Sequence, residues 1–180
     1  MAAIALLGGT FDPVHNAHLA MARAALAALP VSKVVFLPTG PTKYRKPALA
    51  SAADRLAMLR LALDREPRFE VDERELAPGA SGYTVDTLKG FDHPYFLMGA
   101  DQLEKLGTWH RPDEVRKLAK LAVFARPGHD VKDKAVAVVP MAALEVSASE
   151  VRARAARGKP LAGLVPPPVA DYIERHALYR

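Results

Sequence analysis

The sequence predicts an α/β protein with a doubly wound, mainly parallel sheet and helices on both faces. Short apolar runs recur along the chain with little polar alternation, which is typical of strands covered on both faces. Segments with helical composition and capping residues lie between these runs, so strand and helix alternate. A sheet of this kind binds its ligands beyond the carboxyl ends of its strands.

The apolar runs and the capping residues locate the expected elements. We expect strands, in chain order, at residues 4–7, 34–37, 95–98, 121–125 and 136–139. We expect a first helix at 19–29, which ends before Pro30, and a second that Ser51 caps and that continues through Leu63. A third is expected from Ser147 or Ser149 to Gly158, and a fourth from the prolines at 166–168 towards Ala177. Residues 38–47 hold three prolines and a glycine and predict a loop that can cover a ligand.

Length and composition indicate one ordinary globular unit. The 180 residues, 50% of them hydrophobic, are enough for one core. Without a repeat or linker, we expect a single domain over 1–180, its helical part at about 147–180 packed on the same core. The apolar start lacks a charged leader and runs into Gly8, so we expect a buried strand rather than a signal peptide or membrane span.

Charge and cysteine content narrow the function classes. The absence of cysteine excludes disulfides, zinc–cysteine sites and a thiol nucleophile, and makes a cytoplasmic enzyme the default expectation. The net charge of +5 comes from scattered basic residues rather than one run. This suits an anionic small molecule, and we expect neither a nucleic-acid nor a membrane partner.

The first motif covers residues 8–18, where the first strand ends and a helix begins. Gly8 and Gly9 let the main chain approach a ligand, and the N–H groups of the next helix favour a phosphate. On a helix beginning near Val14, His15 and His18 would project from one face and donate to phosphate oxygens. Taken singly, the glycines could form a plain turn and a histidine could be a cap; the combination favours function.

The second motif covers residues 146–152 and opens an alanine- and arginine-rich helix. Ser147, Ser149 and the helix N-terminus can hold phosphates, and Arg152 can make a bidentate contact. Alone, this segment would be an ordinary capped helix with a solvated arginine. Together with the first motif, it favours a phosphate site.

These motifs and the blocks between them resemble the bacterial nicotinate-nucleotide adenylyltransferases, within the nucleotidyltransferases that carry a His-x-Gly-His signature. The resemblance extends over nearly the whole chain. Its further blocks, in the family's order, are residues 72–76, 82–84 with 87–88, 98–101, 108–109, 126–128 and 178–180. The histidine motif alone indicates only the superfamily, because pantetheine-phosphate and cytidylyl-transferring relatives share it.

The resemblance implies transfer of the adenylyl group of ATP to nicotinate mononucleotide, giving nicotinate adenine dinucleotide and pyrophosphate. Direct attack of the acceptor phosphate is implied, with Mg²⁺ accompanying ATP. No Ser-His-Asp or Cys-His arrangement stands out, so catalysis would rest on positioning and charge stabilisation. Nicotinamide mononucleotide and phosphopantetheine are alternative acceptors, and a non-catalytic nucleotide-binding or RNA-associated module is the alternative from another class. Assembly into a homo-oligomer is left open.

Carried over by motif, the resemblance implies three groups of site residues and no protein ligand to a metal. The catalytic group is His15, His18 and Arg152. The ATP-binding group is Gly8, Gly9, Thr10, Phe11, Asp101, Arg126, Ser147 and Ser149. The acceptor-binding group is Arg45, Tyr83, Thr84, Trp109 and His110, with Trp109 stacking on the pyridine ring and main-chain N–H groups near Thr84 and His110 receiving the carboxylate.

Simpler interpretations stand beside several of these roles. Asp101 could cap the following helix, Trp109 could pack in the core, and Arg126 could be solvated. Residues 72–75 could be an exposed edge with local ion pairs, and we leave them out of the catalytic group.

The sequence also departs from the family pattern. Ala17 replaces the usual glycine between the histidines and adds a methyl group near the expected phosphate. Ala148 removes one hydroxyl from the second motif. The loop carries Lys43, Arg45 and Lys46 where the family has a Pro-Pro-His-Lys pattern, and of these cations we assign only Arg45.

Overall fold

The computed structural model describes residues 3–41, 46–125, 131, 133–142 and 144–180. Its six-stranded sheet has the order β3-β2-β1-β4-β5-β6, and every neighbouring pair is parallel. The strands are β1 (Ala3–Gly9), β2 (Val31–Pro38), β3 (Phe69–Val71), β4 (Tyr95–Gly99), β5 (Lys120–Ala125) and β6 (Ala137–Pro140). The expected doubly wound parallel sheet is confirmed. Strand order reverses between β1 and β4, so their carboxyl ends flank the crevice where such sheets bind ligands.

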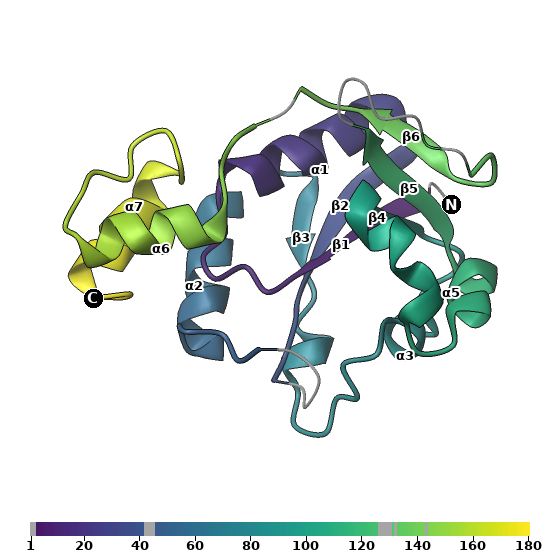
Figure 1. Ribbon diagram of the computed structural model, residues 1–180, viewed down its shortest axis with the longest axis horizontal. Helices are drawn as coiled ribbons and strands as arrows, with labels where there is room; N and C mark the ends of the chain where they lie inside the picture. The colour runs from purple at the N-terminus through teal and green to yellow at the C-terminus, as the bar shows by residue number, and fades with distance from the viewer. Residues whose placement is uncertain (1–2, 42–45, 126–130, 132, 143) are drawn as a thin grey trace.

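Helices cover both faces of the sheet (Figure 1), which explains why the strands read as unbroken apolar runs. One core cluster joins the sheet to α1 (Asn16–Ala28), α2 (Ala52–Leu63), α6 (Ala148–Ala156) and α7 (Pro167–Arg175). The other joins the opposite face to α3 (Thr84–Leu88) and α5 (Pro112–Leu118). Neighbouring residues of β1 divide between the two clusters, because successive side chains of a strand point to opposite faces: Leu6 belongs to one and Leu7 to the other.

Capping residues set the starts of the longer helices. The Ser51 hydroxyl accepts the N–H of Asp54 and begins α2, as expected. Ser147 accepts the N–H of Glu150 and begins α6, so Ser147 rather than Ser149 caps this helix. The expected start of α1 near Val14 is wrong. His15 has an extended main chain and occupies the N-cap position, so the helix begins at Asn16.

Several short elements carry too little pattern to be found in the sequence. The edge strand β3 has three residues, and α3 and α4 (Ala100–Glu104) have five each. Single turns of 3-10 helix, η1 (Arg74–Leu76) and η2 (Leu106–Thr108), complete the connections. Such elements owe their conformation to packing on the sheet rather than to periodicity.

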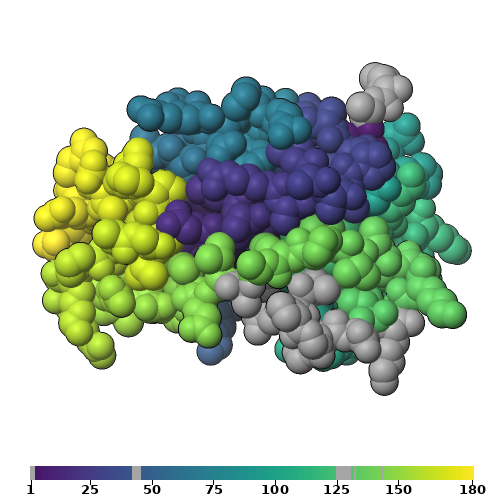
Figure 2. All heavy atoms as spheres, turned by 90° about the horizontal axis from the view of Figure 1, so that it is seen from above, coloured from purple at the N-terminus to yellow at the C-terminus, as the bar shows by residue number. Residues whose placement is uncertain are grey.

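The helices α6 and α7 lie at one end of the molecule, next to α2 (Figure 1). Seen from above, these C-terminal residues meet the residues that open α1 (Figure 2). There the main-chain N–H of Asn16 donates to the carbonyl of Leu164, and its side-chain amide donates to the carbonyl of Gly163, both at 2.9 Å. Within the described part of the chain, no helix is long and apolar enough to cross a membrane.

Candidate active site

The loop between β1 and α1 is shaped by Phe11. Its main chain has a left-handed φ of 48°, and its ring folds back so that a Cβ at Gly9 would lie 3.1 Å from it. The ring is 2% exposed and meets the His18 ring edge-on, with centroids 4.9 Å apart. The Phe11 ring therefore packs against the His18 ring inside the protein. Any contact between Phe11 and ATP would have to come from the main chain of Phe11.

His15 and His18 lie together at the start of α1. Their rings stack with centroids 3.7 Å apart, and the main-chain N–H of His15 donates to Nδ1 of His18 at 3.2 Å. Because His18 Nδ1 accepts this bond, the proton of its neutral imidazole sits on Nε2. The structure thus brings both histidines together, although His15 does so from the N-cap rather than from a helix face.

Burial keeps both imidazoles uncharged. Burial lowers the pKa of His15 to about 4. Burial and then the charge of His15 hold the pKa of His18 well below its usual 6.5. Within the described residues, the buried Nδ1 of His15 has no hydrogen-bond partner, and such an atom usually has one. At neutral pH the pair can serve as hydrogen-bond donors without carrying charge.

A cavity of about 530 Å³ opens beside the histidines at the crevice between β1 and β4. Its lining consists of His15, Ala17, His18, Met21, Gly99, Ala100, Asp101, Glu104, Phe124, Met141, Leu144, Glu145 and Val146. Gly99 occupies the N-cap position of α4, so the interpretation of Asp101 as that cap is wrong. Asp101 instead offers an exposed carboxylate to the cavity, and Ala17 places its methyl group in the wall.

The second motif meets the first despite the distance in sequence. The Ser147 and Ser149 hydroxyls lie 3.0 Å apart at the N-terminus of α6. Nη1 of Arg152 donates to the carbonyl of Asp12 at 2.7 Å, across 140 residues. Hydroxyls, helix N–H groups and a guanidinium therefore gather beside the β1–α1 loop, an arrangement suited to phosphates.

Three residues of this region were missed by the sequence analysis. Asp12 is 6% exposed, and its carboxylate accepts the Tyr179 hydroxyl at 2.7 Å. Arg55, 3% exposed, donates from Nη1 to the carbonyl of Thr10 at 2.6 Å. Asp12 and Tyr179 fall inside the motif blocks, and Arg55 is a charged residue among the core-facing positions of α2, which is the signal that could have found it.

A second cavity, of about 460 Å³, lies on the α2 side of the loop. Thr10, Thr39, Gly40, Lys46 and Arg55 are among its lining residues. Arg55 and Lys46 give this cavity a cationic wall. Nε of Arg55 is itself buried and has no hydrogen-bond partner within the described ranges. The expected site residues Arg45 and Arg126, and the neighbouring Lys43, lie outside the described residues.

The expected acceptor residues gather on the side of the sheet covered by α3 and α5. Tyr83 precedes Thr84, the first residue of α3, and its ring stacks on His110 with centroids 4.1 Å apart. Trp109 is half-buried and meets Phe96 of β4 edge-on at 6.1 Å, so core packing accounts for part of its role. None of the four expected acceptor residues Tyr83, Thr84, Trp109 and His110 is among the described lining residues of the two cavities.

Residues 72–76 divide between surface and core. Asp72 and Arg74 form the expected local ion pair. Glu75, however, is 9% exposed and accepts the Thr87 hydroxyl at 2.7 Å, so an exposed edge is the wrong description for it. A Cβ added at Gly40 would lie only 2.1 Å from the carbonyl oxygen of Glu75, so only glycine fits at position 40. Glu75 thus connects the loop after β2 with α3.

Comparisons with known proteins place the chain in a family. A family model described as cytidylyltransferase-like matches residues 6–154. Curated proteins named probable nicotinate-nucleotide adenylyltransferase, from Laribacter hongkongensis and Bordetella petrii, are each 42% identical to the chain. The first comparison covers 99% of this chain and 94% of the relative, and the second covers 100% of both.

A solved structure of Plasmodium falciparum nicotinic acid mononucleotide adenylyltransferase complexed with NaAD has the same fold. It aligns with a TM-score of 0.77 and covers 99% of this chain and 98% of that one. A structure of a putative nicotinate-nucleotide adenylyltransferase from Vibrio parahaemolyticus aligns with a TM-score of 0.73, covering 100% and 96%. The identities are 16% and 15%, so these likenesses concern the fold alone.

Proposed function

Because the chain belongs to the nicotinate-nucleotide adenylyltransferases, within the cytidylyltransferase-like family, we propose that it transfers the adenylyl group of ATP to nicotinate mononucleotide. The products are nicotinate adenine dinucleotide and pyrophosphate, and the role belongs to NAD biosynthesis in the cytoplasm. The observation that carries the proposal is the Arg152–Asp12 hydrogen bond, which joins the two phosphate-binding motifs at the carboxyl end of β1.

ATP fits the crevice between β1 and β4. The apolar part of the larger cavity, with Phe124, Met141 and Leu144, suits an adenine ring. Asp101 can accept a hydrogen bond from a ribose hydroxyl. The triphosphate then reaches the histidine pair and the serines of α6, and Gly8, Gly9 and Thr10 offer main-chain groups beside it.

The reaction needs positioning and charge stabilisation rather than an acid or base. An ionised phosphate oxygen of the acceptor attacks the α-phosphorus of ATP, and the bond to the β-phosphate breaks as pyrophosphate leaves. Nε2–H of His18 is available to donate to the α-phosphate, where charge develops. Arg152 offsets the charge of the departing pyrophosphate, and the hydroxyls of Ser147 and Ser149 donate hydrogen bonds to it.

The acceptor is proposed to lie across the loop from ATP. Its phosphate matches the cationic wall formed by Arg55 and Lys46. Its pyridine ring is proposed to lie beside Trp109, with N–H groups near Thr84 and His110 receiving the carboxylate. Main-chain donors of this kind would favour the acid over the amide.

Mg²⁺ is proposed to accompany ATP. In the described part of the chain, no three His, Cys, Asp or Glu side chains come together as an ion site. A cation held by phosphate oxygens and water suits such a site, since magnesium commonly binds through its nucleotide. When bound, it supplies neutralisation of the triphosphate charge.

The test is pyrophosphate release by the purified protein with Mg-ATP and nicotinate mononucleotide, with the dinucleotide identified by mass. His18→Ala should lower kcat by roughly 100-fold or more, the usual effect of removing one preorganised donor, with the fold retained. Near-normal turnover would remove His18 from the mechanism. ATP binding without pyrophosphate release, under the same conditions, would instead favour the non-catalytic module.

A further inference from the structure

Asp12 joins segments that are far apart in the sequence. Its carboxylate accepts the N–H groups of Leu49 at 2.7 Å and Ala50 at 3.1 Å, and the Tyr179 hydroxyl at 2.7 Å. Its carbonyl accepts Nη1 of Arg152 at 2.7 Å. Because His15 follows three residues later and Arg152 binds the Asp12 carbonyl, Asp12 is in contact with one phosphate-binding motif and is part of the other.

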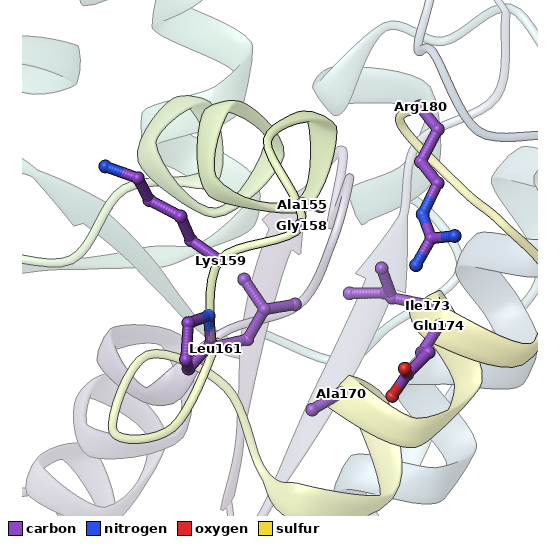
Figure 3. A pocket seen from close by; sticks show the side chains of 9 residues that line it. Ala155, Gly158, Lys159, Leu161, Ala170, Ile173, Glu174 and Arg180 are labelled. Atoms are coloured by element: carbon purple, nitrogen blue, oxygen red, sulfur yellow. The ribbon is translucent and has the colours of Figure 1, made fainter.

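Tyr179 is held in place to reach this carboxylate. After α7, the N–H of Leu178 donates to the carbonyl of Ile173 at 3.0 Å, and Tyr179 adopts a left-handed φ of 65°. The chain therefore turns back, and Leu178 and Tyr179 pack on the core cluster that includes Leu7 of β1. Arg180 points elsewhere, towards Ile173 across a separate cavity of about 280 Å³ (Figure 3).

The hydrogen bond from Tyr179 has a fixed direction. Burial, followed by the hydrogen bond and charge of Asp12, raises the pKa of the Tyr179 hydroxyl far above its usual value. The hydroxyl therefore stays protonated and donates. The other two donors to the carboxylate are main-chain N–H groups, so among the described residues Tyr179 is its one side-chain donor.

We propose that Tyr179 is a positioning residue for the adenylyl transfer: by holding the Asp12 carboxylate, it sets the place of Arg152 and His15 against the triphosphate. This inference rests on the proposed function for its kinetic consequence. Tyr179 touches no reacting atom and acts through Asp12. Misplaced groups cost most where charge develops, so the effect belongs mainly to kcat rather than to the KM for ATP.

Tyr172 of α7 provides a matched control. Its hydroxyl donates to Oδ1 of Asp54 at 3.0 Å, so it is also a partly buried tyrosine bound to a carboxylate. That bond joins α7 to α2 and does not involve Asp12. Tyr172→Phe thus removes the same hydroxyl from the same end of the molecule without releasing the phosphate-binding loop.

The experiment compares steady-state kinetics of Tyr179→Phe and Tyr172→Phe well below their unfolding temperatures, with circular dichroism to verify the fold. Tyr179→Phe should lower kcat roughly tenfold and change the KM for ATP by less than about threefold. Tyr172→Phe should leave both near wild type. Equal kcat values in the two variants, or a loss confined to KM, would overturn the proposal.

Amide hydrogen exchange at Leu49 and Ala50 tests the same bond without turnover. Exchange at both amides should be faster in Tyr179→Phe and unchanged in Tyr172→Phe, because the Asp12 carboxylate loses the hydroxyl that orients it. Unchanged exchange in Tyr179→Phe would overturn the positioning role whatever the acceptor is. Faster exchange in Tyr179→Phe, in a protein that is inactive with nicotinate mononucleotide, would support the positioning of Asp12 by Tyr179 and refute the proposed function.

Discussion

In the histidine pair, burial sets the charge of the imidazoles and one hydrogen bond sets which nitrogen of His18 carries the proton. Nδ1 of His18 accepts the N–H of His15, so the proton of the neutral ring is placed on Nε2. The edge-on contact with Phe11 holds that ring in place. A neutral donor avoids the cost of a buried charge in the ligand-free protein and still stabilises charge that develops on a phosphate.

Burial of these histidines predicts a pH-dependent stability. The unfolded chain protonates a histidine near pH 6.5, whereas folded His15 does so only near pH 4. The stability of the ligand-free protein should therefore be full above about pH 6.5 and fall towards pH 4. The slope should be about 1.4 kcal/mol per pH unit for each histidine protonated only in the unfolded state.

Urea unfolding at several pH values between 7.5 and 5 measures this slope directly. His15→Gln, which places an uncharged side chain at the N-cap of α1, should lower the slope by about 1.4 kcal/mol per pH unit and leave the contribution of His18. A free energy of unfolding that stays constant from pH 6.5 to pH 5 in the wild-type protein would contradict the assignment of two neutral imidazoles.

At the scale of elements, capped helices are predictable and short packed segments are not. Ser51 and Ser147 identify the starts of α2 and α6 through local chemistry that a sequence displays. The three residues of β3 have no such pattern, because pairing with β2 determines their conformation. The burial of Glu75 is equally hidden, since it depends on Thr87 in a neighbouring element.

The Glu75–Thr87 hydrogen bond predicts a selective effect on the acceptor. Thr87→Val removes the donor and should loosen α3, which begins at Thr84, so the KM for nicotinate mononucleotide should rise about three- to tenfold. The KM for ATP should change little, because ATP is proposed to bind at the other side of the loop. Thr87→Ser keeps the hydroxyl and should behave like wild type. Equal increases in both KM values in Thr87→Val would refute the separation of the acceptor site from the ATP site.

Over the whole molecule, alternation of apolar runs and helices was enough to predict the fold class, because a parallel sheet covered on both faces requires that pattern. The histidine motif and the α6 motif could likewise be placed at strand and helix ends. The resemblance implies that both motifs bind the same ATP. The contact that joins them, the hydrogen bond from Arg152 to the Asp12 carbonyl across 140 residues, could not be predicted because it depends on the tertiary structure. The single-domain division and the roles of all the expected site residues stay predictions, and of these residues Arg45 and Arg126 also lie outside the described part of the chain.

The identity of the acceptor can be measured in a single competition experiment. Purified protein receives Mg-ATP with equal concentrations of nicotinate mononucleotide, nicotinamide mononucleotide and phosphopantetheine, and the adenylylated products are quantified by mass spectrometry. We expect nicotinate adenine dinucleotide to form first and to predominate, with pyrophosphate released in equal amount. Predominance of the amide dinucleotide or of dephospho-coenzyme A would contradict this expectation.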